Sequence, residues 1–278
     1  MNTLGNETWR DFINLYPGLP NQLIKAMKKL AFFLLLIING ISFAQTTPVK
    51  DTRPNMLIIT CHPDDWELSM AGTAYLLKDR YHIHIIILSD GELGNTWNTT
   101  GKPDPVLGAK RVDDANKTAE KIGATNYFFK MKDSGVYADE EAVNKTITLM
   151  KSLDPSIIFI HWPIDKPDHV AASAIAMMAL ARTGLMYSRE VYFFEVEELN
   201  HFTPEIFIDI SGLWSVKRDL VHFHERYNDD RFEKMAEENA IKNGLLNHCK
   251  YAEGFIPLFP LSNLRSDRHT VCTLLDLK

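Results

Sequence analysis

The segment MLIITCHPDDWE, Met56 to Glu67, ends an apolar run in a histidine and two adjacent aspartates. His62 and Asp65 stand three residues apart, close enough in a turn to bind one cation. Catalytic zinc sites commonly combine nitrogen and oxygen ligands with a water molecule. Asp64 lies between these two residues, and a carboxylate there can take a proton from a water molecule that the metal has acidified. The segment therefore predicts a hydrolytic metal centre.

A second polar cluster, HWPIDKPDH from His161 to His169, follows the apolar run SIIFI. His169 begins a predicted helix, and we expect it to be the third ligand of one zinc ion per chain. The alternative is that the His-Pro-Asp turn only caps a helix, because aspartate at an N-cap accepts backbone N–H bonds. Polar clusters after two separate strands favour the metal site.

Strands and helices alternate along the sequence, as judged from hydrophobic periodicity. The predicted strands are 55–60, 81–90, 125–130, 155–162, 190–196 and 205–211, and the predicted helices are 67–80, 109–123, 139–153, 169–183, 214–227 and 230–250. This order predicts an α/β, Rossmann-like three-layer fold with a mostly parallel sheet. Such sheets bind ligands at the carboxyl ends of their strands, so the two polar clusters should meet at one rim.

Composition narrows the class of partner. The chain has 278 residues, a net charge of -6 and a pI near 5.9. No basic field is available for a polyanion, which argues against nucleic acid and anionic membrane surfaces as partners. We expect a small-molecule or glycan substrate, and the sequence leaves the oligomeric state open.

The N-terminal region resembles a secretory signal peptide. Met27 is followed by two lysines, by the apolar run Leu30 to Ile38, and by small residues that place a cut after Ala44. The alternative is an anchoring helix, but the run falls short of the roughly 18 residues that span a bilayer. We therefore expect a signal peptide region at 1–44 that starts at Met27, a single domain at 45–278, and export to the periplasm or the extracellular space without stable membrane insertion.

The cysteines and two further histidines carry weaker signals. A disulfide between Cys249 and Cys272 is possible in an oxidising compartment, whereas Cys61 ends an apolar strand and is expected to be a small buried residue. His82 and His84 lie away from the carboxyl end of their strand. We expect them to pack or to face solvent.

Several motifs in order resemble the LmbE/PIG-L family. They are HPDD after the first strand, LSDGELG after the second, an arginine in a helix that ends in IG, PDH after a later strand, then FIDIS..WSVK......H and YAEGF. The resemblance covers essentially the whole chain after the signal peptide region. It implies the Rossmann-like fold of that family and a zinc-dependent de-N-acetylase that acts on compounds containing N-acetylglucosamine.

Carried over residue by residue, the resemblance implies roles that agree with those inferred from spacing. His62, Asp65 and His169 fall on the zinc ligands of the family, and Asp64 falls on its general base. Asp168, beside the third ligand, would be the carboxylate that orients it.

The resemblance also implies contacts to the substrate. Arg111 falls on the family's substrate-contacting arginine, and the loop around Glu92 would lie on the sugar side. Trp97, in the loop 91–108, is a possible platform for stacking on a sugar ring, or it can equally pack that loop down.

Two departures concern the catalytic acid. Many family members have His-Pro-Asp-His where this chain has Lys166 before Pro-Asp-His, and a lysine can stabilise an oxyanion but is a poor proton donor unless its pKa is lowered. His161 and Asp165 are nearby substitutes. His224 keeps the histidine of the family's H.SQ ending, while Arg226 and Tyr227 replace its polar pair.

The predicted activity is thus a metal-dependent amidohydrolase that releases acetate from an N-acetylated amino sugar or glycoconjugate. One alternative is a catalytically impaired, carbohydrate-binding relative. Another is a different single-metal hydrolase on the same scaffold; a phosphoesterase often uses two metals. A nucleotide-binding Rossmann protein is the least supported alternative, because no G-x-G-x-x-G follows the first strand.

Overall fold

A computed structural model describes residues 18, 20–27, 29–30, 51–94, 100–196, 202–224, 230–259 and 273–277. The chain divides into two units, Met1–Asp51 and Thr52–Lys278. In the first unit, residues 21–27 are helical. In the portions described, the helices are too short or too polar to cross a bilayer. The predicted cleavage site after Ala44 lies outside the described residues, so the export of the chain stays a prediction.

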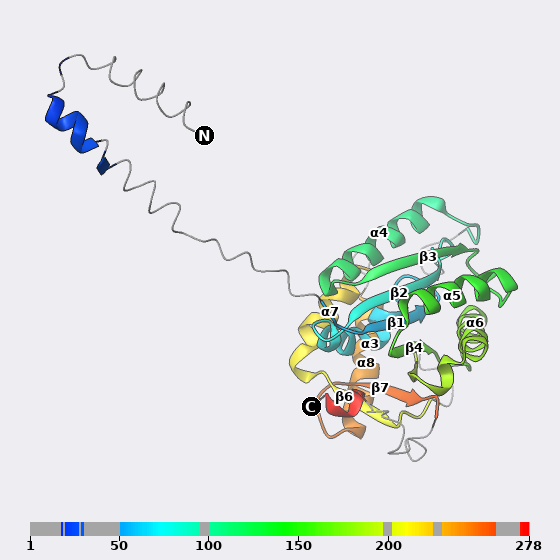
Figure 1. Cartoon of the computed structure of the whole chain (residues 1–278). Coiled ribbons are helices and arrows are strands. Elements are labelled where there is room, and N and C mark those ends of the chain that lie inside the picture. Colours follow the sequence, from blue (N-terminus) through cyan, green and yellow to red (C-terminus); the bar gives the residue numbers. More distant parts are fainter. Residues whose placement is uncertain are drawn as a thin grey trace. The chain divides into compact units, whose positions relative to one another are not determined.

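The second unit is built on a seven-stranded sheet in the order β3-β2-β1-β4-β5-β7-β6 (Figure 1). The strands are β1 (Asn55–Thr60), β2 (His82–Ser89), β3 (Thr125–Met131), β4 (Ile157–His161), β5 (Glu190–Phe194), β6 (Ile206–Asp209) and β7 (Ala252–Pro257). Strands β1 to β5 pair in parallel, whereas β7 is antiparallel to both β5 and β6. The predicted mostly parallel α/β sheet is confirmed.

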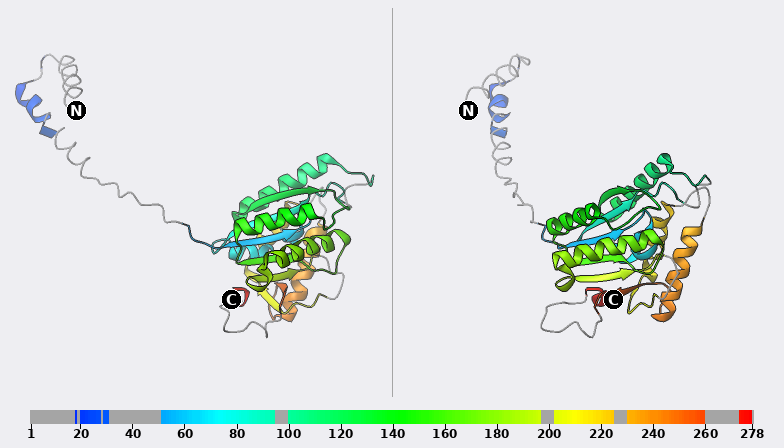
Figure 2. Two further views of the ribbon diagram at one scale, coloured as in Figure 1. Left: turned by 45° about the vertical axis from the view of Figure 1, so that its right-hand side comes forward. Right: turned by 90° about the vertical axis from the view of Figure 1, so that its right-hand side faces the viewer.

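Helices cover both faces of this sheet (Figures 1 and 2). They are α3 (Asp65–Leu77), α4 (Pro105–Ile122), α5 (Glu140–Leu153), α6 (Pro167–Thr183), α7 (Trp214–His222) and α8 (Arg231–Leu246), with short 3-10 turns η1 (Leu185–Tyr187), η2 (Ser211–Leu213) and η4 (Thr273–Asp276). Alternate residues of β1 enter two cores: Met56 and Ile58 pack with α3, α4, α7 and α8, and Leu57 and Ile59 pack with α5 and α6. Both faces of the central strands are therefore buried, as expected for a parallel sheet.

Two elements differ from the sequence prediction. Helix α4 begins at Pro105, inside the predicted loop, because the Asp104 side chain accepts the N–H groups of Val106 and Leu107 and proline is well suited to the first helical position. Strand β7 was not predicted. It contains Gly254 and Pro257, residue types that weaken a strand signal.

Helix α3, which carries part of the polar cluster, is kinked. Met70 has φ -143° and ψ 20°, so the helix ladder is interrupted there. The Glu253 carboxylate of β7 accepts the N–H groups of Gly72 at 2.9 Å and Thr73 at 2.7 Å, and the buried Lys217 ammonium lies 2.7 Å from the same carboxylate. Glu253 thus caps the second half of α3. The YAEGF motif has a structural role: it holds the helix that follows the HPDD turn.

Candidate active site

Polar side chains that follow parallel strands meet at one rim of the sheet, as the two-cluster pattern predicted. His62, Asp64 and Asp65 follow β1, and His169 lies in the first turn of α6, after β4. The rings of His62 and His169 have their centroids 5.3 Å apart. The three predicted ligands, His62, Asp65 and His169, offer atoms that all lie within 4.8 Å of one another.

Asp65 is held by the backbone that precedes it. Its Oδ2 accepts the N–H groups of His62 at 2.7 Å and Cys61 at 3.1 Å and the hydroxyl of Thr60 at 3.1 Å. Its Oδ1 lies 3.4 Å from Nε2 of His169. Asp65 does not act as a helix cap. One carboxylate oxygen fixes the turn, and the other is directed to the neighbouring ligand.

The carboxylate that lies next to Nδ1 of His169 is not the predicted one. Nδ1 of His169 lies 3.1 Å from Oδ1 of Asp165. We predicted that Asp168 would fill this role, but Asp168 accepts the backbone N–H groups of Ser134 at 2.7 Å and Val136 at 3.3 Å. The reason lies in the backbone: Asp165 is in the turn that precedes α6 and brings its carboxylate to the His169 ring, whereas the side chain of Asp168, in the first turn of α6, is held by the segment after β3.

Asp133 is a member of the rim that the sequence reasoning missed. It follows β3, its Oδ1 lies 3.3 Å from Nε2 of His62, and its Oδ2 accepts the N–H of Leu93 at 2.8 Å. Burial opposes ionisation of this carboxyl, but the hydrogen bond and charge of His62 and the Leu93 N–H bring its pKa down to about 2. The signal was available: Asp133 follows an apolar strand as His62 does.

The electrostatics of this cluster suit a bound cation. Burial alone would lower the pKa of His169, but the carboxylates of Asp65 and Asp165 raise it to about 9. An imidazole whose pKa is raised so far lies in a strongly negative field. Imidazole and carboxylate donors in one small cluster are a set that zinc accepts. The residues present therefore fit the metal that the sequence predicts.

Asp64 has the properties expected of a general base. Its backbone is in the left-handed region, with φ 123°, which is uncommon and strained for an aspartate. Its side chain caps no helix; Oδ2 instead accepts a hydrogen bond from Nη2 of Arg111 at 2.7 Å. Burial raises the pKa of Asp64 to about 6, against the lowering effect of Arg111. A carboxylate with a pKa near neutrality is suited to proton abstraction.

Arg111 is anchored on three sides. Besides Asp64, its guanidinium donates to the carbonyl oxygens of Pro63 at 2.6 Å and Gly91 at 3.1 Å. It lines the cavity described below, so the predicted contact to substrate is geometrically available. Arg111 also fixes the strained turn that presents Asp64.

A cavity of about 460 Å³ opens over this cluster. The predicted residues that line it are His62, Asp64, Asp65, Arg111, Lys166, Asp168, His169 and His224, together with apolar residues of α3 and α8 such as Leu68, Phe232 and Met235. The cavity is of the size that binds a small ligand. It brings most of the predicted site residues to one surface.

Two predicted residues do not reach that surface. His161 is fully buried and is not among the described residues that line the cavity. Its Nε2 accepts a hydrogen bond from the backbone N–H of Cys61 at 3.0 Å, so His161 does not replace the family histidine as a catalytic acid. Glu92 accepts the backbone N–H of Asp133 at 3.1 Å and supports the rim rather than lining the cavity. Trp97, Arg226, Tyr227 and Cys272 lie outside the described residues, so their predicted roles stay predictions.

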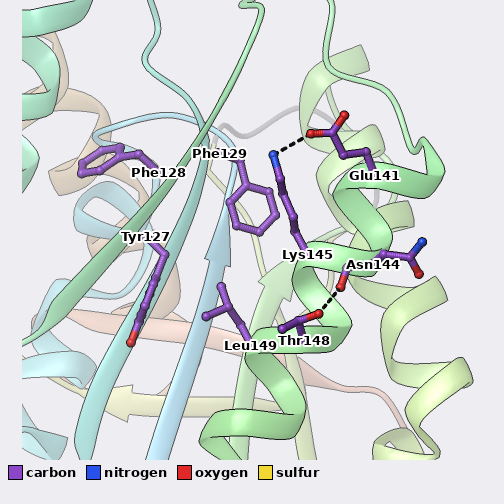
Figure 3. A pocket seen from close by; sticks show the side chains of 8 residues that line it. All are labelled: Tyr127, Phe128, Phe129, Glu141, Asn144, Lys145, Thr148 and Leu149. Carbon is purple, nitrogen blue, oxygen red and sulfur yellow. Dashed lines mark hydrogen bonds and ion pairs between the residues drawn. The ribbon is translucent and has the colours of Figure 1, made fainter.

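A second hollow, of about 750 Å³, lies between the edge strand β3 and α5 (Figure 3). Tyr127, Phe129 and Leu149 give it an apolar floor, and Lys145 forms an ion pair of 2.7 Å with Glu141 at its margin. Among the described residues that line it, none is a histidine, cysteine or aspartate. The described lining of this hollow therefore lacks the histidines and aspartates that line the rim cavity.

Comparisons with known proteins agree with the geometry of the rim. Residues 57–180 match the family model described as PIG-L: GlcNAc-PI de-N-acetylase. This range includes the polar residues His62, Asp64, Asp65 and His169. A diacetylchitobiose deacetylase of Thermococcus kodakarensis is 24% identical over 242 residues, covering 80% of this chain and 90% of that protein. A 4-oxalmesaconate hydratase of Pseudomonas putida is 25% identical over 240 residues, covering 77% of this chain and 91% of that protein.

Solved structures share the fold. The N,N'-diacetylchitobiose deacetylase of Pyrococcus horikoshii superimposes with a TM-score of 0.64 and 21% identity, covering 84% of this chain and 97% of that one. At this identity the structural similarity shows only that the fold is shared, whereas the match to the family model relates residues 57–180 to the family. The chain therefore contains a domain of the PIG-L/LmbE family.

Proposed function

We propose that this protein is a zinc-dependent hydrolase that removes the acetyl group from an N-acetylated amino sugar or glycoconjugate. The observation that carries the proposal is the position of Asp64, a buried carboxylate with a raised pKa, beside the cluster of His62, Asp65 and His169 in one cavity. Relatives named as deacetylases of acetylated sugars support this reaction.

The residues divide the work as follows. His62, Asp65 and His169 would hold one zinc ion, which when bound acidifies water and polarises a carbonyl group. Asp64 accepts the proton of the attacking water. Arg111 holds Asp64 in place and keeps part of its charge neutralised. Lys166, at the cavity margin, contributes positive charge near the oxyanion that develops on the acetamide oxygen.

The site of action is proposed from the N-terminal segment. A signal peptide cleaved after Ala44 would deliver the enzyme to the periplasm or outside the cell, where the substrate would be an extracytoplasmic glycan. N-terminal sequencing of the protein recovered from its host tests this. A mature chain that begins at Gln45 supports export, and one that retains Met27 contradicts it.

Hydration of an unsaturated acid is a second candidate, favoured by the similarity to the 4-oxalmesaconate hydratase. A metal and a carboxylate base can also activate water for addition to a double bond. The two reactions differ in product, because only hydrolysis releases acetate. An acetate-release screen over N-acetylated sugars of increasing size, run beside a spectrophotometric screen of unsaturated dicarboxylic acids, separates them.

The base assignment is tested with Asp64→Asn. We expect this variant to bind one zinc ion per chain, as measured by metal analysis, and to release acetate about 10² to 10⁴ times more slowly, the usual contribution of a general base. Asp113→Asn is the matched control, since Asp113 forms a surface ion pair with Lys117 on α4 and should leave the rate unchanged. Zinc-loaded Asp64→Asn protein with the wild-type rate would exclude Asp64 as the base.

A further inference from the structure

Glu67 is a buried acid that the mechanism above does not use. It lies on α3, two residues after Asp65, and its side chain is completely buried. Its Oε1 accepts a hydrogen bond from the hydroxyl of Thr118 at 2.6 Å and lies 2.9 Å from Nε2 of His224. Within the described parts of the chain, Oε2 has no hydrogen-bond partner. A buried carboxylate in such surroundings is costly unless a cation accompanies it.

His224 is the residue that can supply this cation. It follows α7, is 4% exposed and lines the cavity that contains Asp64 and Arg111. Burial alone would lower the pKa of His224, but the Glu67 carboxylate, with a smaller effect from Asp64, raises it, and Arg111 opposes them. The pair therefore favours an imidazolium ion at the wall of the cavity.

The geometry also determines which ring nitrogen of His224 donates its proton to Glu67. An ionised carboxylate only accepts hydrogen bonds, so Nε2 of His224 must carry a proton and donate it to Glu67. Nδ1 is the other ring nitrogen. It is buried and has no hydrogen-bond partner among the described residues, and because its side chain lines the cavity, a bound substrate is the partner that it can take. This arrangement parallels carboxylate–histidine pairs in which the acid fixes the tautomer of a catalytic imidazole.

We propose that Glu67 is the positioning residue that makes His224 the general acid of the deacetylation, with Nδ1 as the proton-donating atom. This inference rests on the proposed function, and it assigns the acid that the lysine at position 166 leaves open. Thr118 holds Glu67 in turn, because its hydroxyl donates to the same oxygen that faces His224.

The step is balanced in protons and electrons. When the tetrahedral intermediate collapses, the C–N bond breaks and its electron pair goes to the nitrogen. The Nδ1 proton of His224 goes to the same nitrogen, so the amine leaves neutral and the imidazole keeps its Nε2 proton. The proton that Asp64 took from water is later lost to solvent, and His224 takes up a new one.

The first experiment varies the leaving group in Glu67→Gln. A sugar amine must be protonated to leave, whereas an arylamine that carries a nitro group needs less help. We expect kcat for an N-acetylglucosamine substrate to fall about 100-fold with KM unchanged, and kcat for a nitroacetanilide to fall less than about fivefold. Equal losses for both substrates would mean that Glu67 is only structural and would overturn the proposal.

A double-mutant cycle tests whether Glu67 acts through His224. Adding Glu67→Gln to a His224→Gln protein should change the deacetylation rate by less than about twofold, because the group being positioned is already gone. A further large loss would contradict the assignment.

Thr118→Val keeps the proposal testable if Glu67→Gln folds poorly. We expect a fall of roughly tenfold with the same dependence on leaving group. Thr146→Val is a matched control: both threonines are fully buried in a helix, and the hydroxyl of each lies near a carbonyl oxygen of its own helix, Thr118 at 3.0 Å from Ala115 and Thr146 at 2.9 Å from Ala142, but only Thr118 also reaches a carboxylate. Thr146→Val should retain the wild-type rates. Equal loss in the two variants would point to a general packing effect and contradict the role of Glu67.

The tautomer can be measured without any activity. In ¹⁵N-histidine-labelled protein, the signals of His224 are identified by their loss in His224→Gln. We expect neutral His224 to carry its proton on Nε2, and Glu67→Gln to weaken that preference. A proton on Nδ1 in the wild type would overturn the proposal. If no N-acetyl substrate releases acetate, the proposed function fails, and this measurement still decides the Glu67–His224 arrangement.

Discussion

At the scale of single residues, the active-site turn depends on close approaches that leave no room for substitution. Gly91 has φ +68°, and a Cβ atom there would lie 2.6 Å from Cζ of Arg111 and nearer still to its Nη1. The Gly91 carbonyl also accepts a hydrogen bond from that guanidinium. A glycine is therefore needed both for the backbone conformation and for the position of the arginine that holds Asp64.

A comparison of Gly91→Ala with Gly101→Ala separates the requirement for a positive φ from the requirement for space beside Arg111. Gly101 has φ +65°, but a Cβ atom added there would meet no described atom within 4 Å, so alanine costs only the backbone strain of about 1 to 2 kcal/mol. We expect Gly91→Ala to lose, in addition, roughly 100-fold in kcat/KM, because Arg111 must move. Equal activity in the two purified variants would contradict this role of Arg111.

At the scale of elements, the polar rim is positioned by a contact between a helix and a late strand. The kink of α3 exposes N–H groups in the middle of the helix, and Glu253 from β7 accepts two of them. The ion pair between Lys217 and Glu253 is almost completely buried, with side chains 2% and 1% exposed. The antiparallel strand β7 thus determines where α3, and with it Glu67, lies above the sheet.

Breaking this ion pair should destabilise the protein strongly. Glu253→Gln leaves the Lys217 ammonium buried without its counter-ion, and we expect a loss of about 3 to 5 kcal/mol in the free energy of unfolding, measured by urea denaturation. The double variant Lys217→Met/Glu253→Gln should lose less than the sum of the two single changes, since it leaves neither charge alone. Strict additivity would show that the two side chains do not interact.

His84 gives the sheet a predictable pH dependence. This histidine of β2 contacts Tyr127 of β3 at 3.2 Å and Asn55 of β1 at 3.1 Å, and burial, with a smaller effect from His82, lowers its pKa below 6.5. The unfolded chain then binds a proton more readily, so the stability due to neutral His84 is present above about pH 6.5 and is lost as the pH falls below it. Thermal melts from about pH 7.5 to about pH 5.5 should show a smaller loss for His84→Gln than for the wild type; an identical pH dependence would contradict this.

At the scale of the whole molecule, acidic groups are concentrated at one end of the sheet. Asp65, Asp133, Asp165 and Asp168 surround two imidazoles in a chain whose net charge is already -6. Without a cation this rim repels itself, so a metal ion should stabilise the fold as well as support chemistry.

Metal removal should therefore lower the melting temperature. A ligand at about 100 times its dissociation constant adds about 2.7 kcal/mol to the free energy of unfolding, and we expect zinc to raise the Tm of chelator-treated protein accordingly. Asp65→Asn should abolish most of this zinc-dependent shift, whereas Asp113→Asn should keep it. A Tm that is insensitive both to chelator and to added zinc would argue against a bound metal.

The sequence alone determined the order of most strands and helices, the mostly parallel sheet, and the meeting of the HPDD and PDH clusters at one rim. Each of these follows from local information: hydrophobic periodicity is read over short windows, and parallel strands place their carboxyl ends together. The sequence did not reveal β7, whose glycine and proline obscure a strand, nor that Asp165 rather than Asp168 lies next to Nδ1 of His169.

Only the tertiary structure decided which polar residues act together. Glu67 and His224 are 157 residues apart, and Glu253 and Gly72 are 181 apart. Such pairs form because packing removes both polar groups from water, and a buried polar group then requires a hydrogen-bond or charge partner. A local sequence pattern does not show which distant residue that partner is. The two aspartates of HPDD are adjacent in sequence, yet Asp65 contacts the backbone turn and His169, whereas Asp64 contacts Arg111. The strained turn between β1 and α3 points the two side chains in different directions.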